Sequence, residues 1–236
     1  IGTLLNGMFG WNITLSAAIV AILSGLYLHA GGQTSVIITD LFQGLLLLAV
    51  GVLVLVLGVQ HIGGFDTLWS GLPAAHRLPF AQFNHPAGYH AVGDFWNDAI
   101  VGTFAFYMIN QGVLMRFLSA RSVHDGRKAM LVTVVVIMPI AALAVTGAGW
   151  VGRAMVTHEI PFEGVAAMQG VIDSTDSDQM DRAARNVFVG VAKTVCQPGV
   201  FGLVIAAVIA ALMSTLDTLI TAVTAICIND VWRPLQ

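Results

Sequence analysis

The sequence is short of charge, of cysteine and of basic clusters. Only 10% of its 236 residues are charged, against about a quarter in an ordinary soluble domain, whereas 57% are hydrophobic. Two cysteines are too few for a disulfide framework. The net charge of −3, without a dense basic patch, argues against a nucleic-acid partner. The composition therefore excludes an ordinary soluble domain and predicts a protein that lives in a lipid bilayer.

The sequence contains several long hydrophobic runs that carry almost no charge. Each is about as long as a helix must be to cross roughly 30 Å of hydrocarbon. The expected transmembrane helices cover residues 11–29, 36–60, 97–118, 130–152 and 199–228. We therefore predict an all-α, polytopic membrane helix bundle of about five transmembrane helices, in one domain over residues 1–236. Because the chain opens almost directly into a span, we interpret it as part of a larger gene product.

The basic residues are unevenly distributed among the loops. Three arginines and a lysine lie between Arg116 and Lys128, whereas the longer stretch 61–94 contains only Arg77. Positive charge is concentrated in cytoplasmic loops, so the short connection should be cytoplasmic. Alternation then places the C-terminal end, with Arg233, inside the cell, in what we expect to be the plasma (inner) membrane.

The two long polar segments contain no sign of a catalytic domain. Residues 61–94 mix Gly, Pro, His and aromatics, as irregular backbone at a membrane interface does, with room for short surface helices. DQMDRAARNVFVGVAK, residues 178–193, has apolar residues near helical spacing and predicts a surface-lying helix. The chain shows no nucleophile–base pair, phosphate loop or paired metal-binding histidines. We predict that it is not an enzyme and that it needs no cofactor.

The last predicted span carries polar side chains near its middle, where the membrane contains least water. Four of them are spaced i, i+3, i+4 and i+7, which puts them on one stripe of a helix. The stripe consists of Ser214, Asp217, Thr218 and Thr221. Hydroxyl and carbonyl oxygens suit a small, hard cation. The hydroxyls alone favour helix packing, whereas the carboxylate of Asp217 tips the balance to an ion pathway or polar relay.

Three segments resemble the sodium:solute symporter family, in the family's order. GLVIAAVIAALMSTLDTLITAVTAICIND, residues 202–230, resembles the helix that carries that family's sodium-binding Ser-Ser or Ser-Thr pair. GGQTSVIITDLFQGLLLL, residues 31–48, is similar to its Gly-Gly turn and Thr-Asp-x-x-Gln helix. NQGVLMRFLSARSVHDGRKA, residues 110–129, is similar to its Asn-Gln-x-x-x-x-Arg stretch. The resemblance covers essentially the whole chain.

The resemblance implies a LeuT-like inverted-repeat transporter, with these five spans as the fourth to eighth helices of a ten-helix core. By similarity, the sodium ligands would be the backbone carbonyl of Ala211 and the side chains of Ser214 and Thr215. Sodium would be the coupling ion and the only metal. The remaining ligands come, in the family, from a first core helix that this sequence does not contain.

Two aspartates belong to the predicted ion pathway together with Thr218. Asp217 either lends negative charge to the cation from behind its ligands or pairs with a polar group on a helix that this sequence does not contain. Asp40 matches the aspartate of the family's Thr-Asp signature and shares a helical face with Gln43. The resemblance places Asp40 on the inner exit route for sodium, and a carboxylate that reaches out to the membrane interface is the alternative.

The third predicted span should contribute to the solute pocket. In the resembled fold its counterpart is interrupted near mid-membrane. Gly102, Gly112 and the polar pair Asn110–Gln111 offer places for such a break, although a plain helix is the alternative. The candidate pocket residues are Thr103, Phe106, Asn110 and Gln111. Thr103 and Phe106 stand where sugar-transporting members have asparagine and tyrosine, which argues against a sugar.

These features predict a secondary active transporter that couples entry of sodium to entry of a small organic solute. A membrane solute-sensing module of a transporter-like signalling protein is the alternative. Residues after Gln236 in the complete gene would discriminate the two, because a long soluble domain there favours sensing and further spans favour transport.

Overall fold

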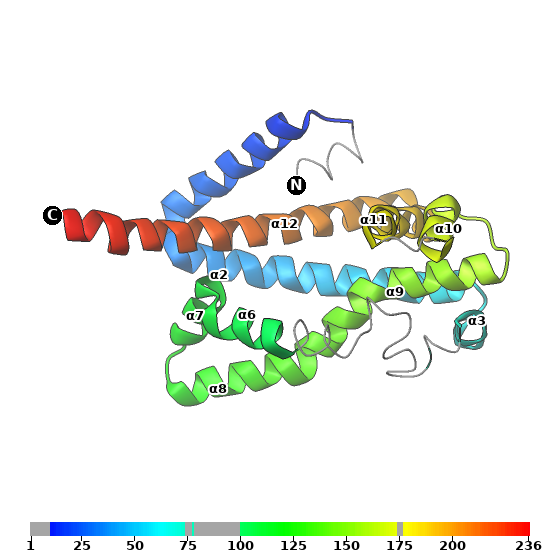
Figure 1. The fold of residues 1–236 in the computed structure, drawn as a ribbon, viewed down its shortest axis with the longest axis horizontal. Coiled ribbons are helices and arrows are strands. Elements are labelled where there is room, and N and C mark those ends of the chain that lie inside the picture. Colours follow the sequence, from blue (N-terminus) through cyan, green and yellow to red (C-terminus); the bar gives the residue numbers. More distant parts are fainter. Residues whose placement is uncertain (1–9, 74–76, 78–99, 174–176) are drawn as a thin grey trace. The chain divides into compact units, whose positions relative to one another are not determined.

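The computed structural model describes residues 10–73, 77, 100–173 and 177–236, and every regular element in them is helical (Figure 1). Three short π or 3-10 turns, η2 to η4, join or extend the α-helices. The elements are α2 (Ile13–His61), α3 (Phe65–Gly71), α6 (Thr103–Ile109), α7 (Gln111–Leu118), α8 (Val123–Val132), η2 (Thr133–Ile137), α9 (Met138–Thr157), α10 (Val165–Asp173), α11 (Ser177–Val195), α12 (Pro198–Ile226), η3 (Cys227–Trp232) and η4 (Arg233–Leu235).

Three helical runs among the described residues are long and apolar enough to cross a membrane. They are Ile13–His61, Val123–Thr157 and Pro198–Leu235. The chain is therefore an all-α, polytopic membrane protein, as its composition predicts. The first predicted span overlaps α2 from Ile13 on, the second falls within α2, and the fourth and fifth fall within the other two runs. The count of five crossings stays a prediction.

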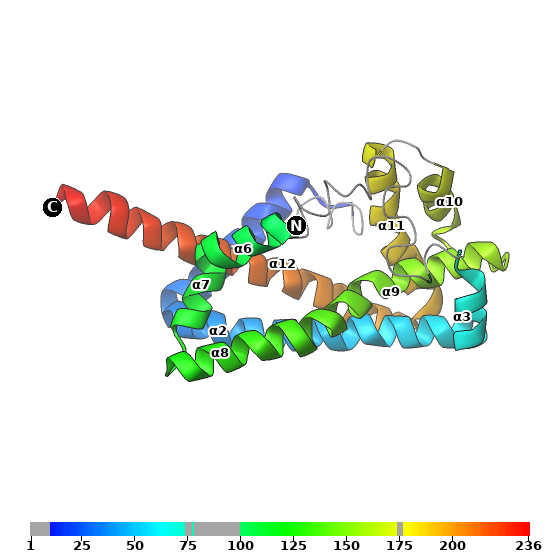
Figure 2. The ribbon, with the colours of Figure 1, turned by 60° about the horizontal axis from the view of Figure 1, so that its bottom comes forward.

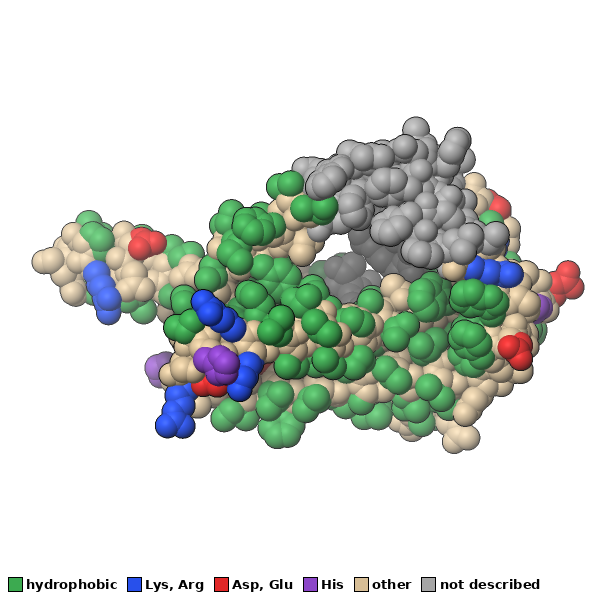
Figure 3. All heavy atoms as spheres, turned by 90° about the horizontal axis from the view of Figure 1, so that it is seen from below, with side chains coloured by type: hydrophobic (Ala, Val, Ile, Leu, Met, Phe, Trp, Pro, Cys, Tyr) green, Lys and Arg blue, Asp and Glu red, His purple; other side chains and the backbone are tan. Residues whose placement is uncertain are grey.

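The surface of the described residues is largely apolar, as expected of a protein that lies in a membrane. Large hydrophobic side chains such as Leu15, Phe42 and Val135 are exposed, and hydrophobic side chains line the described helices in Figure 3. A soluble protein rarely exposes so much contiguous apolar surface, because water would not wet it favourably. A lipid environment removes that cost.

Helix α2 is not a single straight helix. Gly32 has φ 59° and ψ −157°, which no helix contains, and the ribbon of α2 changes direction between its blue and light-blue parts (Figure 1). Only glycine adopts this combination readily, because a Cβ would clash with the backbone. The Gly-Gly turn that the resemblance implies at the start of residues 31–48 is therefore present.

We expect Gly32→Ala to destabilise the complete protein by about 1–3 kcal/mol, because alanine at this φ and ψ is strained. No atom lies within 4 Å of the position that a Cβ would occupy, so crowding adds nothing. Gly44→Ala is the matched control, because Gly44 is helical with equally open surroundings. Thermal unfolding in detergent should show a lower midpoint for Gly32→Ala only. Equal midpoints for the two variants would contradict the assignment of the break to Gly32.

The chain forms two compact units. The first unit comprises residues 1–47, 109–129 and 205–236, and the second comprises residues 48–108 and 130–204. Polar residues that the sequence singled out in 31–48, 110–129 and 202–230 fall mostly in the first unit.

In the second unit, the end of α2 packs closely on α9 through small residues. A Cβ at Gly51 would overlap Ala144, and one at Gly58 would overlap Val151. From the α9 side, a Cβ at Gly147 would press on Leu55. Such contacts let two helix backbones approach closely, which is how helices in lipid gain packing energy.

The remaining helices of the second unit gather on α9. Helix α10 packs on α11, both contact α9, and α3 contacts α9 as well (Figure 2). The helix expected over residues 178–193 is present as α11, and α3 is one of the short helices expected in 61–94. Most of the rest of 61–94 lies outside the described residues. Cys196, just after α11, is a free thiol whose pKa is raised by burial.

Candidate functional site

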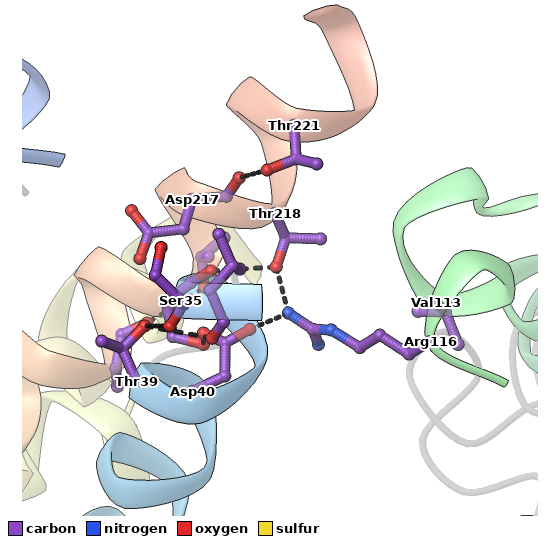
Figure 4. Close-up of polar contacts among 12 residues, drawn as sticks. Ser35, Thr39, Asp40, Val113, Arg116, Asp217, Thr218 and Thr221 are labelled. Atoms are coloured by element: carbon purple, nitrogen blue, oxygen red, sulfur yellow. Dashed lines mark hydrogen bonds and ion pairs between the residues drawn. The ribbon is translucent and has the colours of Figure 1, made fainter. Parts of the chain in front are cut away.

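A cluster of charged and hydroxyl side chains occupies the first unit (Figure 4). It draws Asp40 from α2, Arg116 from α7, and Ser214 and Thr218 from α12. The Arg116 guanidinium donates to Asp40 Oδ2 and to Thr218 Oγ1. Ser214 Oγ donates to Asp40 Oδ1 at 2.5 Å. Both carboxylate oxygens of Asp40 are thus bound, and its side chain is only 11% exposed.

The start of α7 explains how Arg116 reaches this cluster. Asn110 has extended backbone, with φ −69° and ψ 108°, and separates α6 from α7. Its side-chain oxygen accepts a hydrogen bond from the Val113 amide at 3.1 Å, which caps the new helix. Arg116 then lies in the last turn of α7, where the helix dipole favours a cation. The third predicted span is therefore interrupted at Asn110, one of the three places that the sequence offers, one residue before α7 begins.

Close packing between α7 and α12 supports the same geometry. Gly112 is buried against Thr218, and a Cβ at Gly112 would overlap the Thr218 methyl group. The space left beside Gly112, Arg116 and Thr218 is a cavity of only about 10 Å³. That is room for about one water-sized sphere.

Three of the four threonines of α12 donate to the carbonyl one turn back. Thr215 donates to Ala211 at 3.1 Å, Thr218 to Ser214 at 3.0 Å, and Thr221 to Asp217 at 2.8 Å. Two of the three predicted sodium ligands, the Ala211 carbonyl and the Thr215 hydroxyl, are therefore neighbours. Carbonyl and hydroxyl oxygens have two lone pairs each, so such a bond leaves acceptor capacity on both.

Asp217 leaves α12 on a different side from Thr218 (Figure 4). Its side chain is fully buried, and Tyr27 of α2 donates its hydroxyl proton to Asp217 Oδ2. The predicted stripe thus divides, with Ser214 and Thr218 toward Asp40 and Arg116, and Asp217 toward Tyr27. Tyr27 is missing from the predicted site, since a lone tyrosine within a span carries no signal of its partner.

Two of the predicted solute-pocket residues line an open pocket in the second unit. The pocket has a volume of about 310 Å³. Its lining residues are Gly102, Thr103, Phe106, Tyr107 and Met138. The rings of Phe106 and Tyr107 meet edge to face, with centroids 5.6 Å apart. Of the other two candidates, Asn110 caps α7 and Gln111 is its half-buried first residue.

The described part of the chain contains no group of three or more His, Cys, Asp or Glu side chains that could hold a metal ion. The donors gathered on α12 are instead hydroxyls and backbone carbonyls with single carboxylates nearby. Such oxygen sets suit alkali and other hard cations rather than zinc, which takes His and Cys ligands.

Long apolar helices define an integral membrane protein, and a cluster of charged and hydroxyl side chains lies among the helices of its first unit. A model of the sodium:solute symporter family matches residues 1–236, so the chain belongs to the sodium:solute symporter family. The relatives described next are sodium-coupled transporters rather than enzymes, in agreement with the absence of catalytic motifs in the sequence.

Curated relatives match nearly all of this chain. It is 26% identical over 230 residues to the mouse sodium-coupled monocarboxylate transporter 2, covering 96% of this chain and 35% of the relative. It is 25% identical over 248 residues to the rabbit (Oryctolagus cuniculus) sodium-dependent multivitamin transporter, covering 98% of this chain and 34% of the relative. It is 26% identical over 235 residues to the human sodium/iodide cotransporter, covering 98% of this chain and 34% of the relative. The chain therefore spans about a third of the length of these relatives. No solved structure matches it.

Proposed function

We propose that the complete protein is a secondary active transporter that couples sodium entry to the uptake of a small organic solute. The observation that carries the proposal is the pairing of the Thr215 hydroxyl with the Ala211 carbonyl in a long apolar helix, with the Ser214 hydroxyl beside it. Family membership and the sodium-coupled relatives support it. Sodium is the coupling ion, and no other cofactor is required.

The sodium ligands in this proposal are the Ala211 carbonyl and the Ser214 and Thr215 hydroxyls. Hydroxyl and carbonyl oxygens replace the water that the ion sheds on entering the span. The Ser214 hydroxyl, which now donates to Asp40, would turn its lone pairs to the ion. Asp40, Thr218 and Asp217 then supply the polar path around the ion.

The contacts of Asp40 support a place on the sodium exit route, rather than a side chain that only extends to water at the membrane interface. One Asp40 oxygen is a hydrogen bond away from Ser214, and the other binds Arg116. An ion released by Ser214 therefore meets a carboxylate at once, while Arg116 competes with the ion for that carboxylate. Competition of this kind keeps an exit site weak enough to release the ion.

The solute pocket in this proposal uses Thr103, Phe106, Asn110 and Gln111. Phe106 offers an apolar face and no hydroxyl, which suits a solute with an apolar part better than a sugar. The relatives named for monocarboxylates and vitamins agree with a small organic solute. If sodium and solute both favour one outward-open state, the sodium gradient drives uptake, and the membrane potential adds about 2.3 kcal/mol per charge per 100 mV.

The loop charges support one direction of insertion. Three arginines and a lysine between Arg116 and Lys128 support a cytoplasmic connection there, and alternation gives a cytoplasmic end at Arg233. We propose insertion in this sense in the plasma (inner) membrane.

Uptake into liposomes that contain the complete protein tests the proposal. We expect Ser214→Ala and Thr215→Ala each to raise the sodium concentration for half-maximal uptake by about tenfold, because each removes one ligand oxygen; a tenfold change corresponds to about 1.4 kcal/mol of binding free energy. Thr146→Ala is the matched control, because Thr146 makes the same bond to the carbonyl one turn back, in α9. Labelled monocarboxylates, vitamins, amino acids and sugars are screened with and without a sodium gradient.

Unchanged sodium dependence in both α12 variants would contradict the proposed ligands. Sodium-dependent solute binding without any uptake would favour a solute-sensing module instead.

A further inference from the structure

Three basic side chains at the connection between α7 and α8 have no ion-pair partner among the described residues. Arg121 precedes α8, Arg127 and Lys128 lie just after its first turn, and all three are exposed. The two ion pairs in the described part of the chain belong to other cations, Arg116 and Lys193. Basic side chains gather in this region of the first unit in Figure 3.

The acidic side chain of α8 is already engaged. Asp125 accepts a hydrogen bond from Ser122 Oγ at 2.7 Å, and the Asp125 amide donates to that Oγ at 3.1 Å. This pair of bonds fixes the start of α8, as a cap does. The dipole of α8 adds partial positive charge at the same end, so it favours an anion there rather than further cations. Positive charge is therefore in excess at this surface.

Exposed apolar side chains flank the same cations. Leu118, the last residue of α7, and Val123, the first of α8, are each 76% exposed. Such side chains are unfavourable in water and favourable among lipid acyl chains. The helical run Val123–Thr157, which is long and apolar enough to cross a membrane, begins at this point. The cations therefore lie where the chain meets the surface of the bilayer.

We propose that Arg121, Arg127 and Lys128 bind the headgroup of an anionic phospholipid, with Leu118 and Val123 against its acyl chains. Guanidinium and ammonium groups donate charge-assisted hydrogen bonds to phosphate oxygens. A zwitterionic headgroup has the same phosphate, but its own cation repels this surface. A soluble phosphate would use the three cations and leave both apolar side chains in water, so a lipid satisfies more of the surface.

The position of the cations, and not only their number, carries the inference. Basic residues in a short loop orient a membrane protein without binding any particular lipid. Here the three cations lie within residues 121–128, have no carboxylate partner in the described chain, and adjoin apolar side chains at the facing ends of two helices. In the orientation proposed above they face the cytoplasmic leaflet, where anionic lipids are concentrated. The inference does not depend on which ion or solute is carried.

Native mass spectrometry of the purified complete protein in detergent tests the inference, with phosphatidylglycerol and phosphatidylcholine as the probes. We expect the wild type to retain one molecule of phosphatidylglycerol that a variant with Arg121→Gln, Arg127→Gln and Lys128→Gln loses, and no such difference for phosphatidylcholine. Each single substitution should weaken binding of that lipid about fivefold, which corresponds to about 1 kcal/mol per lost charge.

Two further variants separate the charge of these residues from their shape. Arg127→Lys keeps the charge and should bind the lipid as the wild type does. Lys193→Gln is the matched control, because it removes a cation that is already paired with Glu163. It should leave binding of phosphatidylglycerol unchanged.

Three results would overturn the inference. The first is equal retention of phosphatidylglycerol by the wild type and the triple variant, and the second is equally tight binding of phosphatidylcholine at this surface. The third is displacement of the lipid by inorganic phosphate at the same concentration, since the acyl chains would then contribute nothing. Should the triple variant aggregate in size-exclusion chromatography, the single variants decide. Sodium-driven uptake into phosphatidylcholine liposomes tests the proposed function separately, so either proposal can fail alone.

Discussion

Replacing Arg116 by glutamine is expected to lower the thermal stability of the complete protein in detergent by about 1–2 kcal/mol. A fully buried ion pair that loses one partner costs about 3–5 kcal/mol, and the Arg116 side chain is 39% exposed, so solvent screens part of that effect. The substitution leaves the Asp40 carboxylate with Ser214 alone and frees Thr218 from the guanidinium. Because Arg116 joins α7 to both α2 and α12, the loss affects these three helices together.

A double-mutant cycle separates the pair from its surroundings. Asp40→Asn alone should destabilise the protein by a similar amount, whereas Asp40→Asn with Arg116→Gln should cost clearly less than the sum of the two, since no charge is then left unpaired. Lys193→Gln is the control, because Lys193 and Glu163 form a pair that is 46% and 64% exposed and should be worth little. Additive effects of the two single variants would mean that the pair makes no contribution in solution.

Gly112→Ala is the second substitution from which we expect a large effect. The added methyl group would occupy the position of the Thr218 methyl, and the cavity beside it, of about 10 Å³, cannot accept the displaced atoms. Overpacking of this kind costs about 1–3 kcal/mol, here by pushing α7 off α12. It also moves Arg116, one turn along the same helix, away from Thr218. We expect a lower unfolding midpoint together with reduced sodium-driven uptake.

Gly149→Ala is the matched control for this effect. Gly149 lies in α9, and no atom lies within 4 Å of the position that its Cβ would take, so the substitution should be neutral or slightly stabilising. A Gly112→Ala protein as stable as Gly149→Ala would show that α7 and α12 are not in contact as described.

The breaks in the helices could be predicted because their causes are local. The Gly-Gly pair at 31–32 and the Asn-Gln pair at 110–111 each contain the residue that the irregular backbone requires, namely glycine at positive φ and asparagine as a helix cap. The ends of the membrane helices are harder to predict from the sequence. The run Val123–Thr157 begins before the predicted span 130–152, because hydropathy detects the apolar part of a helix and not its polar first turns.

The partners of the polar residues could not be predicted from the sequence. Asp40 and Arg116 are 76 residues apart, and Tyr27 and Asp217 are 190 apart, so only the fold brings them together. The stripe on α12 was predicted as one face, whereas it serves two. Successive residues on a helix are about 100° apart, so Asp217 and Thr218 point to different neighbours although they lie on one broad stripe.

The capped break at Asn110 gives α7 a freedom that a continuous helix would deny it. A helix of eight residues with its own cap can pivot about the two backbone dihedrals of Asn110 without unwinding. Such a pivot would displace Arg116, because Arg116 lies in the last turn of α7, far from Asn110. The same movement would separate Arg116 from both Asp40 and Thr218. A small rotation at Asn110 would therefore be enough to open the polar cluster.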